Sequence, residues 1–255
     1  MPGSTLTPWL VESIVRLGAC LPFEQVPALV AHFTGVTVSV ETARRLTEAA
    51  GAVQVTRETV AAAHLTRTLP APPVGPPVQL VSVDGAMVPL VGGEWAEART
   101  LAIGTVTVGT DGTPATSALS SCARLTDAAA FADLAIVETH RRGTTTAGTV
   151  VAVADGATSC QSFVDLQRPN AVRILDFPHA VEHLGMVAQA VFGAGSAAAS
   201  EWLGVQAHAL RHGAEETVLA ELARLTGVTA GNLEARTVCA QVLAYLTTRR
   251  EQIRY

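Results

Sequence analysis

Residues 78–85 read VQLVSVDG and residues 149–156 read TVVAVADG, and these two similar stretches decide the fold. Each is a short, mainly apolar run rich in valine that ends on an Asp-Gly pair. Such a run is typical of a buried strand, and the glycine allows a sharp turn directly after it. We therefore predict one strand in each stretch, with its aspartate at the strand end.

Apolar periodicity predicts an alternation of strands and helices around these two stretches. In chain order we expect strands at 78–84, 87–98 and 100–109, a helix at 127–141, a strand at 149–154, a short helix at 162–166, a strand at 171–175 and a helix at 178–192. The polar stretch 110–121 is expected to be a loop. Strands joined by short loops favour antiparallel pairing, whereas strands separated by helices favour parallel crossovers. This order is the one found in RNase H-like folds, so we predict an α/β protein with three antiparallel strands followed by two parallel ones.

The N-terminal segment, residues 1–68, predicts helices. Two helices at 7–17 and 23–33 precede a third at 40–50, which Ser39 would cap and after which Gly51 would end the helix. A helix, a glycine-containing turn and a helix carrying two arginines form the outline of a helix-turn-helix. A plain helical hairpin has the same pattern, so both interpretations stay open from these residues alone.

The segments that flank the predicted α/β core have different compositions. Residues 69–77, LPAPPVGPP, contain five prolines, which exclude helix and sheet and favour a stiff extended spacer. The core is then expected at 78–192. Residues 193–255 predict a helical insertion, with breaks near Gly213 and Gly227.

Composition narrows the classes of function. Hydrophobic residues make up 49% of the chain, so it should fold, and the net charge of −5 argues mildly against a nucleic-acid binder. The four cysteines show no CxxC spacing and predict reduced thiols. The chain has neither the layout of a signal peptide nor an apolar run long enough to span a bilayer. We expect a cytoplasmic protein without membrane contact.

Asp84 and Asp155 are the candidate metal ligands. The first and fourth strands of an RNase H-like sheet are neighbours, so both carboxylates should lie side by side at one edge. Two like charges held close are costly unless a cation joins them. Mg²⁺ (or Mn²⁺) takes carboxylate oxygens, and two such ions roughly 3.5–4 Å apart can support in-line phosphoryl transfer. Asp-Gly after a strand is also an ordinary turn, and the residues alone leave both interpretations open.

A third polar group follows the last predicted strand. Residues 175–184, LDFPHAVEHL, place Asp176 at the strand end and His179, Glu182 and His183 on the next helix. The spacing from His179 to His183 fits the HxxEH zinc motif of one class of metallopeptidase. A helix start in which His179 bonds to Asp176 explains the same residues without zinc.

Several motifs, taken in order, resemble those of bacterial insertion-sequence transposases of the DDE class. They are VSVDGAMVP at 81–89, EWAEARTLAIG at 94–104, VVAVADGA at 150–157 and ILDFPHAVEHL at 174–184. The upstream segment 33–51 and the later HALRHG and AYLTTRREQIRY, residues 208–213 and 244–255, also resemble parts of these proteins. The resemblance covers nearly the whole chain.

The resemblance implies a role for each group of residues. Asp84 and Asp155 would be the first two catalytic acids and would bind Mg²⁺ (or Mn²⁺), and the motif beside them comprises Asp176, His179, Glu182 and His183. The N-terminal helices would bind DNA, both the terminal sequences of the element and its target. The residues expected on the recognition helix are Ser39, Thr42, Arg44 and Arg45. A homodimer is a further expectation.

The sequence departs from this family in one respect. Such proteins continue past the YLTTRREQIRY stretch to a GSG-x-x-E segment whose glutamate completes the catalytic triad, and 1–255 contains no such segment. We expect a truncated reading frame or a separately encoded remainder, with part of the apolar sheet face exposed and a tendency to self-associate. The alternatives are a catalytically inactive remnant that binds DNA or dimerises, and a zinc hydrolase that uses His179 and His183.

Overall fold

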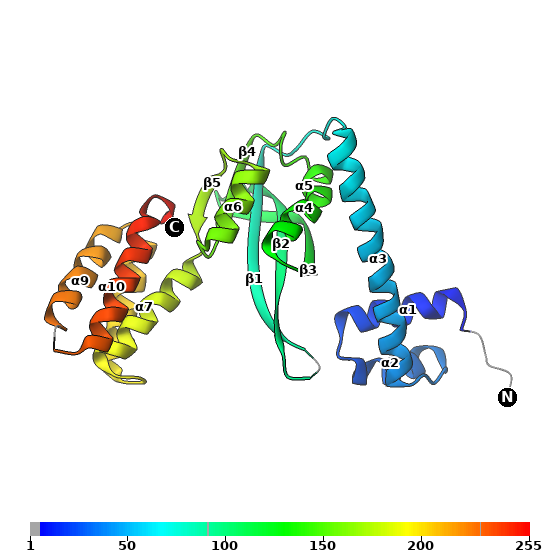
Figure 1. Ribbon diagram of the computed structural model, residues 1–255, viewed down its shortest axis with the longest axis horizontal. Helices are drawn as coiled ribbons and strands as arrows, with labels where there is room; N and C mark the ends of the chain where they lie inside the picture. Colours follow the sequence, from blue (N-terminus) through cyan, green and yellow to red (C-terminus); the bar gives the residue numbers. More distant parts are fainter. Residues whose placement is uncertain (1–5, 91, 230) are drawn as a thin grey trace. The chain divides into compact units, whose positions relative to one another are not determined.

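The computed structural model describes residues 6–90, 92–229 and 231–255 (Figure 1). The chain divides into two compact units, Met1–Leu69 and Pro70–Tyr255. Within the described part of the chain, no helix combines the length and the apolar character needed to cross a membrane.

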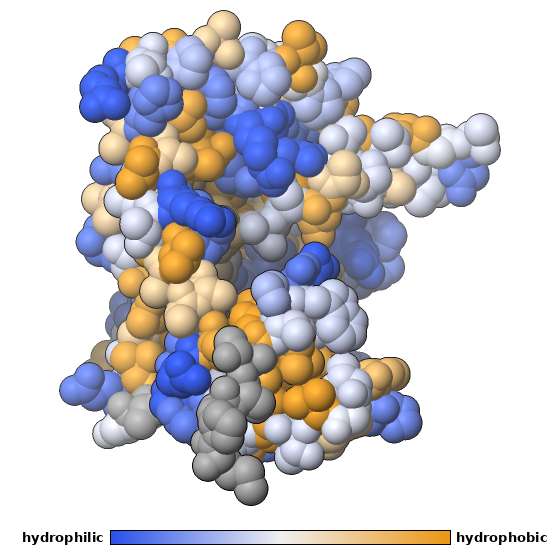
Figure 2. All heavy atoms as spheres, turned by 90° about the vertical axis from the view of Figure 1, so that its right-hand side faces the viewer, coloured by the Kyte–Doolittle hydropathy of each residue, from blue (hydrophilic) through white to orange (hydrophobic). Residues whose placement is uncertain are grey.

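The N-terminal unit is helical. Its elements are α1 (Pro8–Cys20), the 3₁₀ turn η1 (Phe23–Gln25), α2 (Val26–Thr34) and α3 (Val40–Thr68). Helix α2 ends at Gly35, whose φ of 71° is the left-handed conformation that glycine adopts without strain. A small core joins the three helices and is formed by Leu10, Ile14, Val26, Val30, Val38 and Ala43. Figure 2 shows hydrophobic residues exposed at the surface beside hydrophilic ones.

Helix α3 extends beyond its predicted end. Ser39 caps it as expected, because its Oγ accepts a hydrogen bond from the backbone N–H of Thr42 at 3.0 Å. The prediction that Gly51 ends the helix is wrong, since α3 continues to Thr68. A glycine inside a helix costs only about 1 kcal/mol relative to alanine, and the alanines on both sides of Gly51 favour the helix.

The second unit contains a mixed sheet of five strands. They are β1 (Val78–Pro89), β2 (Trp95–Val108), β3 (Pro114–Leu125), β4 (Thr149–Ala154) and β5 (Val172–Leu175), in the spatial order β3-β2-β1-β4-β5. β1 to β3 pair antiparallel, whereas β4 lies parallel to β1, and β5 lies parallel to β4. This is the predicted RNase H-like arrangement, so the predicted fold class is confirmed.

The first three strands differ from the prediction. The predicted strand at 87–98 is wrong, because this stretch contains the end of β1 and the start of β2, and the predicted third strand at 100–109 belongs to β2. β1 does not end at Asp84 but continues to Pro89, because β2 pairs with it along its whole length, from Gln79 opposite Thr105 to Pro89 opposite Trp95. β3 lies largely in the stretch that was predicted as a loop. Its serines, threonines and alanines are mostly exposed on an edge strand, so they carry no apolar alternation that the sequence could reveal.

Helices cover one face of the sheet (Figure 1). They are α4 (Ala128–Leu134), α5 (Ile136–Arg141) and α6 (Thr158–Gln167), so the single helix predicted over 127–141 is two short ones. Phe131 and Phe163 stack at 6.0 Å and pack on Val83 and Leu101 from alternate positions of β1 and β2. On the opposite face, the alternate apolar side chains are partly exposed: Leu80, Val151, Val153 and Ile174.

The proline-rich segment is extended, and residues 70–77 belong to the second unit. Thr146 Oγ1 lies 2.6 Å from the carbonyl oxygen of Pro73 and accepts a hydrogen bond from the N–H of Gly75 at 2.9 Å. A Cβ at Gly75 would lie 2.2 Å from the carbonyl oxygen of Gly143, so only glycine allows this close approach. The segment is therefore extended, as predicted, and is held along the loop that precedes β4.

Helices follow the sheet. α7 (Phe177–Phe192), α8 (Ala197–Arg211), α9 (Glu215–Val228) and α10 (Leu233–Thr248) precede the 3₁₀ turn η2 (Arg250–Gln252). α10 packs against both α7 and α9, around buried side chains that include Leu184, Leu222 and Leu246 (Figure 1). A break occurs at Gly213, as predicted, but Gly227 lies inside α9.

Candidate metal centre

Asp84 and Asp155 lie at the same level of two adjacent strands. Ser82 of β1 and Val153 of β4 are opposite each other in the parallel pairing, and each aspartate stands two residues further along its own strand or just past its end. Because side chains two residues apart share a face, both aspartates project on the side of Ser82 and Val153. The sequence prediction placed both at strand ends, but only Asp155 is there.

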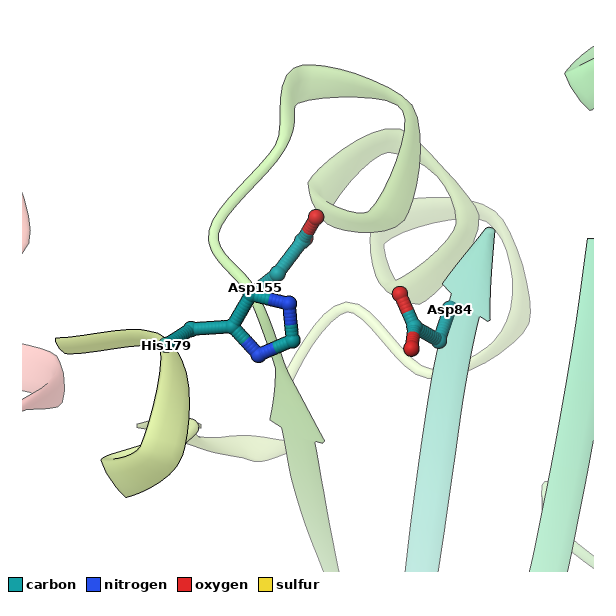
Figure 3. Close-up of side chains that lie close together, drawn as sticks. All are labelled: Asp84, Asp155 and His179. Carbon is teal, nitrogen blue, oxygen red and sulfur yellow. The ribbon is translucent and has the colours of Figure 1, made fainter. Parts of the chain in front are cut away.

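His179 joins the two aspartates. It lies in the first turn of α7, directly after β5, which is the neighbour of β4. One potential ligand atom from each of Asp84, Asp155 and His179 lies within 4.8 Å of the others, and all three residues are half-buried. Figure 3 shows the three side chains converging. The sheet topology thus brings together residues from three separate segments of the chain.

The ring of His179 is oriented by Asp176, the residue that precedes α7. Nδ1 of His179 and Oδ2 of Asp176 are 2.8 Å apart. This hydrogen bond raises the pKa of His179 above its ordinary value. Burial of the ring lowers the pKa by a smaller amount, and the charges of Asp176 and Asp84 raise it further. Nε2 remains to face the two carboxylates, an arrangement typical of a metal-binding histidine whose other nitrogen donates to a carboxylate.

The donor set fits a divalent cation. Two carboxylates close together repel each other unless a cation or a proton lies between them. Two aspartate oxygens with one imidazole nitrogen, all half-buried, form a cluster that could hold one metal ion and leave further coordination positions open.

Backbone hydrogen bonds fix the turns that carry the two aspartates. Oδ1 of Asp155 accepts from the N–H of Ala157 at 2.8 Å, and Oδ1 of Asp84 accepts from the N–H of Gly85 at 2.7 Å. The thiol of Cys160 lies close by. Its burial, followed by the charge of Asp155, raises its pKa to about 12.

Arg99, within the quoted stretch EWAEARTLAIG, connects β2 to α6 beside the centre. Its guanidinium donates to Ser159 Oγ at 2.9 Å and to Glu97 at 2.7 Å. Glu97 lies so close to Gly85 that a Cβ there would approach its Oε1 to 2.1 Å. The glycine after Asp84, predicted as a turn residue, instead makes room for the Glu97–Arg99 pair inside the β1–β2 ladder.

The other polar residues of the HxxEH stretch do not join the cluster. Glu182 is exposed on α7. The ring of His183 lies against the ring of Tyr245, with centroids 3.9 Å apart. Burial, followed by the charges of Arg249 and His179, lowers the pKa of His183. Among the described residues, the group that could bind a metal through His179 includes the two aspartates and not His183.

Two residues that contact the centre were missed by sequence reasoning. Tyr245 and Arg249, at the C-terminal end of α10, donate hydrogen bonds to the carbonyl oxygens of Asp155 and Gly156. Both lie in the stretch AYLTTRREQIRY, which the sequence analysis used only for its resemblance. No local signal could have paired them with Asp155, because about ninety residues separate them.

The four residues predicted for DNA recognition lie at the start of α3. Ser39 and Thr42 bond to each other within the helix cap, with 2.9 Å between their hydroxyl oxygens. Arg44 forms exposed ion pairs with glutamates on the turns before and after it, at 2.7 and 2.8 Å. Arg45 is exposed.

Fold and site together define an α/β protein with an RNase H-like sheet and a candidate metal centre. A comparison of the sequence with models of known protein families finds no match. A comparison with curated protein sequences finds none either. The functional argument therefore rests on the fold and on the geometry of the cluster.

Proposed function

We propose that this chain is a metal-dependent DNA strand-transfer enzyme, a transposase of the insertion-sequence type. The observation that carries the proposal is the cluster of Asp84, Asp155 and His179, with ligand atoms within 4.8 Å of one another. Asp84 lies in β1, Asp155 follows the neighbouring strand β4, and His179 lies in the helix that follows β5 of the RNase H-like sheet. Metal-dependent cleavage of phosphodiesters needs carboxylates in such a group.

Asp84, Asp155 and His179 would hold Mg²⁺ or Mn²⁺. Carboxylates suit both ions, and the imidazole nitrogen favours Mn²⁺ over Mg²⁺. When bound, the ion would supply Lewis-acid stabilisation of the charge that develops on the phosphate. Asp176 would keep the ring of His179 in position through the 2.8 Å hydrogen bond. The three ligand residues are half-buried, so the centre is not sealed inside the protein.

The N-terminal unit would bind DNA, including the ends of the element and its target. The outline of a helix-turn-helix supports this DNA-binding role. It consists of α2, the turn at 35–39 and α3, and Arg44 and Arg45 are exposed near the start of α3. Exposed ion pairs such as those of Arg44 are worth little, so a phosphate can replace the glutamates. The net charge of −5 predicts weak binding without the correct DNA sequence.

Calorimetric titration of the metal-free protein with Mn²⁺ and with Mg²⁺ tests the metal centre. Asp84→Asn and Asp155→Asn should each weaken Mn²⁺ binding by more than the roughly 10–100-fold loss that follows removal of an outer partner. Asp133→Asn is the matched control, because Asp133 is an exposed aspartate on α4. Absence of metal binding by the parent protein would refute the proposal.

Nicking of supercoiled plasmid DNA tests the catalytic step. If Asp84, Asp155 and His179 suffice for cleavage without the glutamate that completes the triad in the transposases the sequence resembles, the parent protein with Mn²⁺ should nick the plasmid and Asp155→Asn should not. If the parent protein binds Mn²⁺ and DNA but leaves the plasmid intact, catalysis is excluded under these conditions. The chain would then be a remnant that binds DNA and metal without strand transfer.

A further inference from the structure

Side chains of the C-terminal helical segment hold the backbone directly after β4. The hydroxyl of Tyr245 donates to the carbonyl oxygen of Asp155 at 2.5 Å. The guanidinium of Arg249 donates twice to the next carbonyl oxygen, that of Gly156, from Nε at 3.0 Å and from Nη2 at 2.6 Å. Two successive carbonyl groups of the turn that carries Asp155 are therefore fixed from a distant part of the chain.

Gly156 makes this contact possible. Its φ of 79° lies in the left-handed region, and a Cβ at this position would lie only 2.2 Å from Nε of Arg249. The guanidinium thus packs directly on bare backbone. The glycine of the second Asp-Gly pair serves the contact with Arg249 as well as the turn.

Tyr245 and Arg249 are themselves held in place. The guanidinium of Arg249 lies 4.2 Å from the centre of the Tyr245 ring, and its Nη1 donates to the carbonyl oxygen of Tyr245 at 3.1 Å. The ring of His183 lies 3.9 Å from the same aromatic ring. His183 stands one helical turn after His179, so α7 contacts the metal centre at one histidine and the tyrosine at the other.

We infer that Tyr245, Arg249 and His183 are positioning residues that set the Asp155 carboxylate for metal binding. The inference rests on the proposed function of the Asp84, Asp155 and His179 cluster. The carboxylate of Asp155 is fixed to its own turn, because Oδ1 accepts from the N–H of Ala157. Whatever holds the turn therefore holds the carboxylate, and partners of this kind tune metal affinity. The C-terminal helices are accordingly part of the site.

Tyr245→Phe tests the tyrosine because it removes the hydroxyl and keeps the ring on which His183 lies. Tyr255→Phe is the matched control, a tyrosine in the same segment whose ring packs on Phe177. In the metal-free protein, deuterium uptake at residues 154–158 should be roughly 2–13-fold faster in Tyr245→Phe, as expected for loss of one hydrogen bond. Mn²⁺ affinity should fall by roughly 10–100-fold. Tyr255→Phe should change neither.

Arg249 gives a test by conservative rescue. Arg249→Met removes both donors to Gly156 and should also weaken Mn²⁺ binding roughly 10–100-fold, whereas Arg249→Lys keeps a charged donor and should recover part of the loss. Circular dichroism of each variant establishes that the helices remain folded.

The outcomes separate this inference from the proposed function. If the parent protein binds Mn²⁺ and Tyr245→Phe binds it equally well, the positioning role is overturned while the metal centre stands. The same conclusion follows if uptake at 154–158 does not change. If the parent protein binds no Mn²⁺, the proposed function fails first, and the positioning role fails with it.

Discussion

Replacement of Gly156 by alanine should destabilise the second unit by about 2.5–5 kcal/mol. The left-handed backbone at φ 79° costs a non-glycine residue about 1–2 kcal/mol. The new Cβ would lie 2.2 Å from Nε and 2.5 Å from Cδ of Arg249, so the guanidinium must move away. Loss of its hydrogen bonds to the Gly156 carbonyl adds about 1.5–3 kcal/mol, because the donor is charged.

Gly213→Ala is the matched control for the backbone contribution. Gly213 has nearly the same conformation, with φ 71°, but a Cβ there would meet nothing within 4 Å. Its replacement should therefore cost only the backbone part, about 1–2 kcal/mol. Urea denaturation of the 255-residue chain, monitored by circular dichroism, gives the free energy of unfolding of each variant.

The combination with Arg249→Ala completes the test. In that background no guanidinium opposes the new methyl group, and its closest remaining neighbour is Cδ1 of Leu175 at 3.2 Å. Gly156→Ala should therefore lose much less stability than in the parent background, close to the loss for Gly213→Ala plus a small cost for moving Leu175. Equal losses for the two glycine variants in the parent background would refute the reasoning, because backbone geometry alone would then explain both.

Two further predictions concern the core and the thiols. Leu101→Ala should lower the free energy of unfolding by about 2–5 kcal/mol, because the Leu101 side chain is fully buried between the sheet and the helices. Leu119 is 67% exposed, so Leu119→Ala should change the free energy of unfolding by less than about 0.5 kcal/mol. Equal urea midpoints for the two variants would contradict the described core. Iodoacetamide at pH 8 should alkylate the exposed Cys20 of the folded protein and spare Cys160, because the raised pKa of Cys160, about 12, leaves almost no thiolate. Equal alkylation rates of the two thiols, measured by mass spectrometry, would contradict the burial of Cys160.

The order of elements could be read from the sequence because it depends on local patterns. The valine-rich run of β4 and the apolar periodicity of α7 each indicate their own structure without reference to the rest of the chain. Together with the short connections early in the sheet, they were sufficient to predict an RNase H-like strand order in which the first and fourth strands pair, although the predicted positions of the second and third strands were wrong. The adjacency of Asp84 and Asp155 follows from that order, since β1 and β4 pair in it.

Pairing partners decided what the local patterns could not. β1 continues past Asp84 because β2 offers hydrogen bonds as far as Trp95, and β3 forms from polar residues because β2 provides a partner for its edge. A strand on an exposed edge needs no apolar alternation, so its sequence resembles a loop. Likewise, α3 continues through Gly51 because the residues on both sides of this glycine favour a helix.

The sequence by itself predicted the fold class and the adjacency of Asp84 and Asp155, because both follow from the order of the strands, although Asp84 lies inside β1 rather than at its end. Only the tertiary structure decided that His179 joins those carboxylates and that His183 contacts Tyr245 instead. It alone brought Tyr245 and Arg249 to the turn after β4. These contacts join segments far apart in the chain, and they depend on how α7 and α10 pack, which no local pattern of residues encodes.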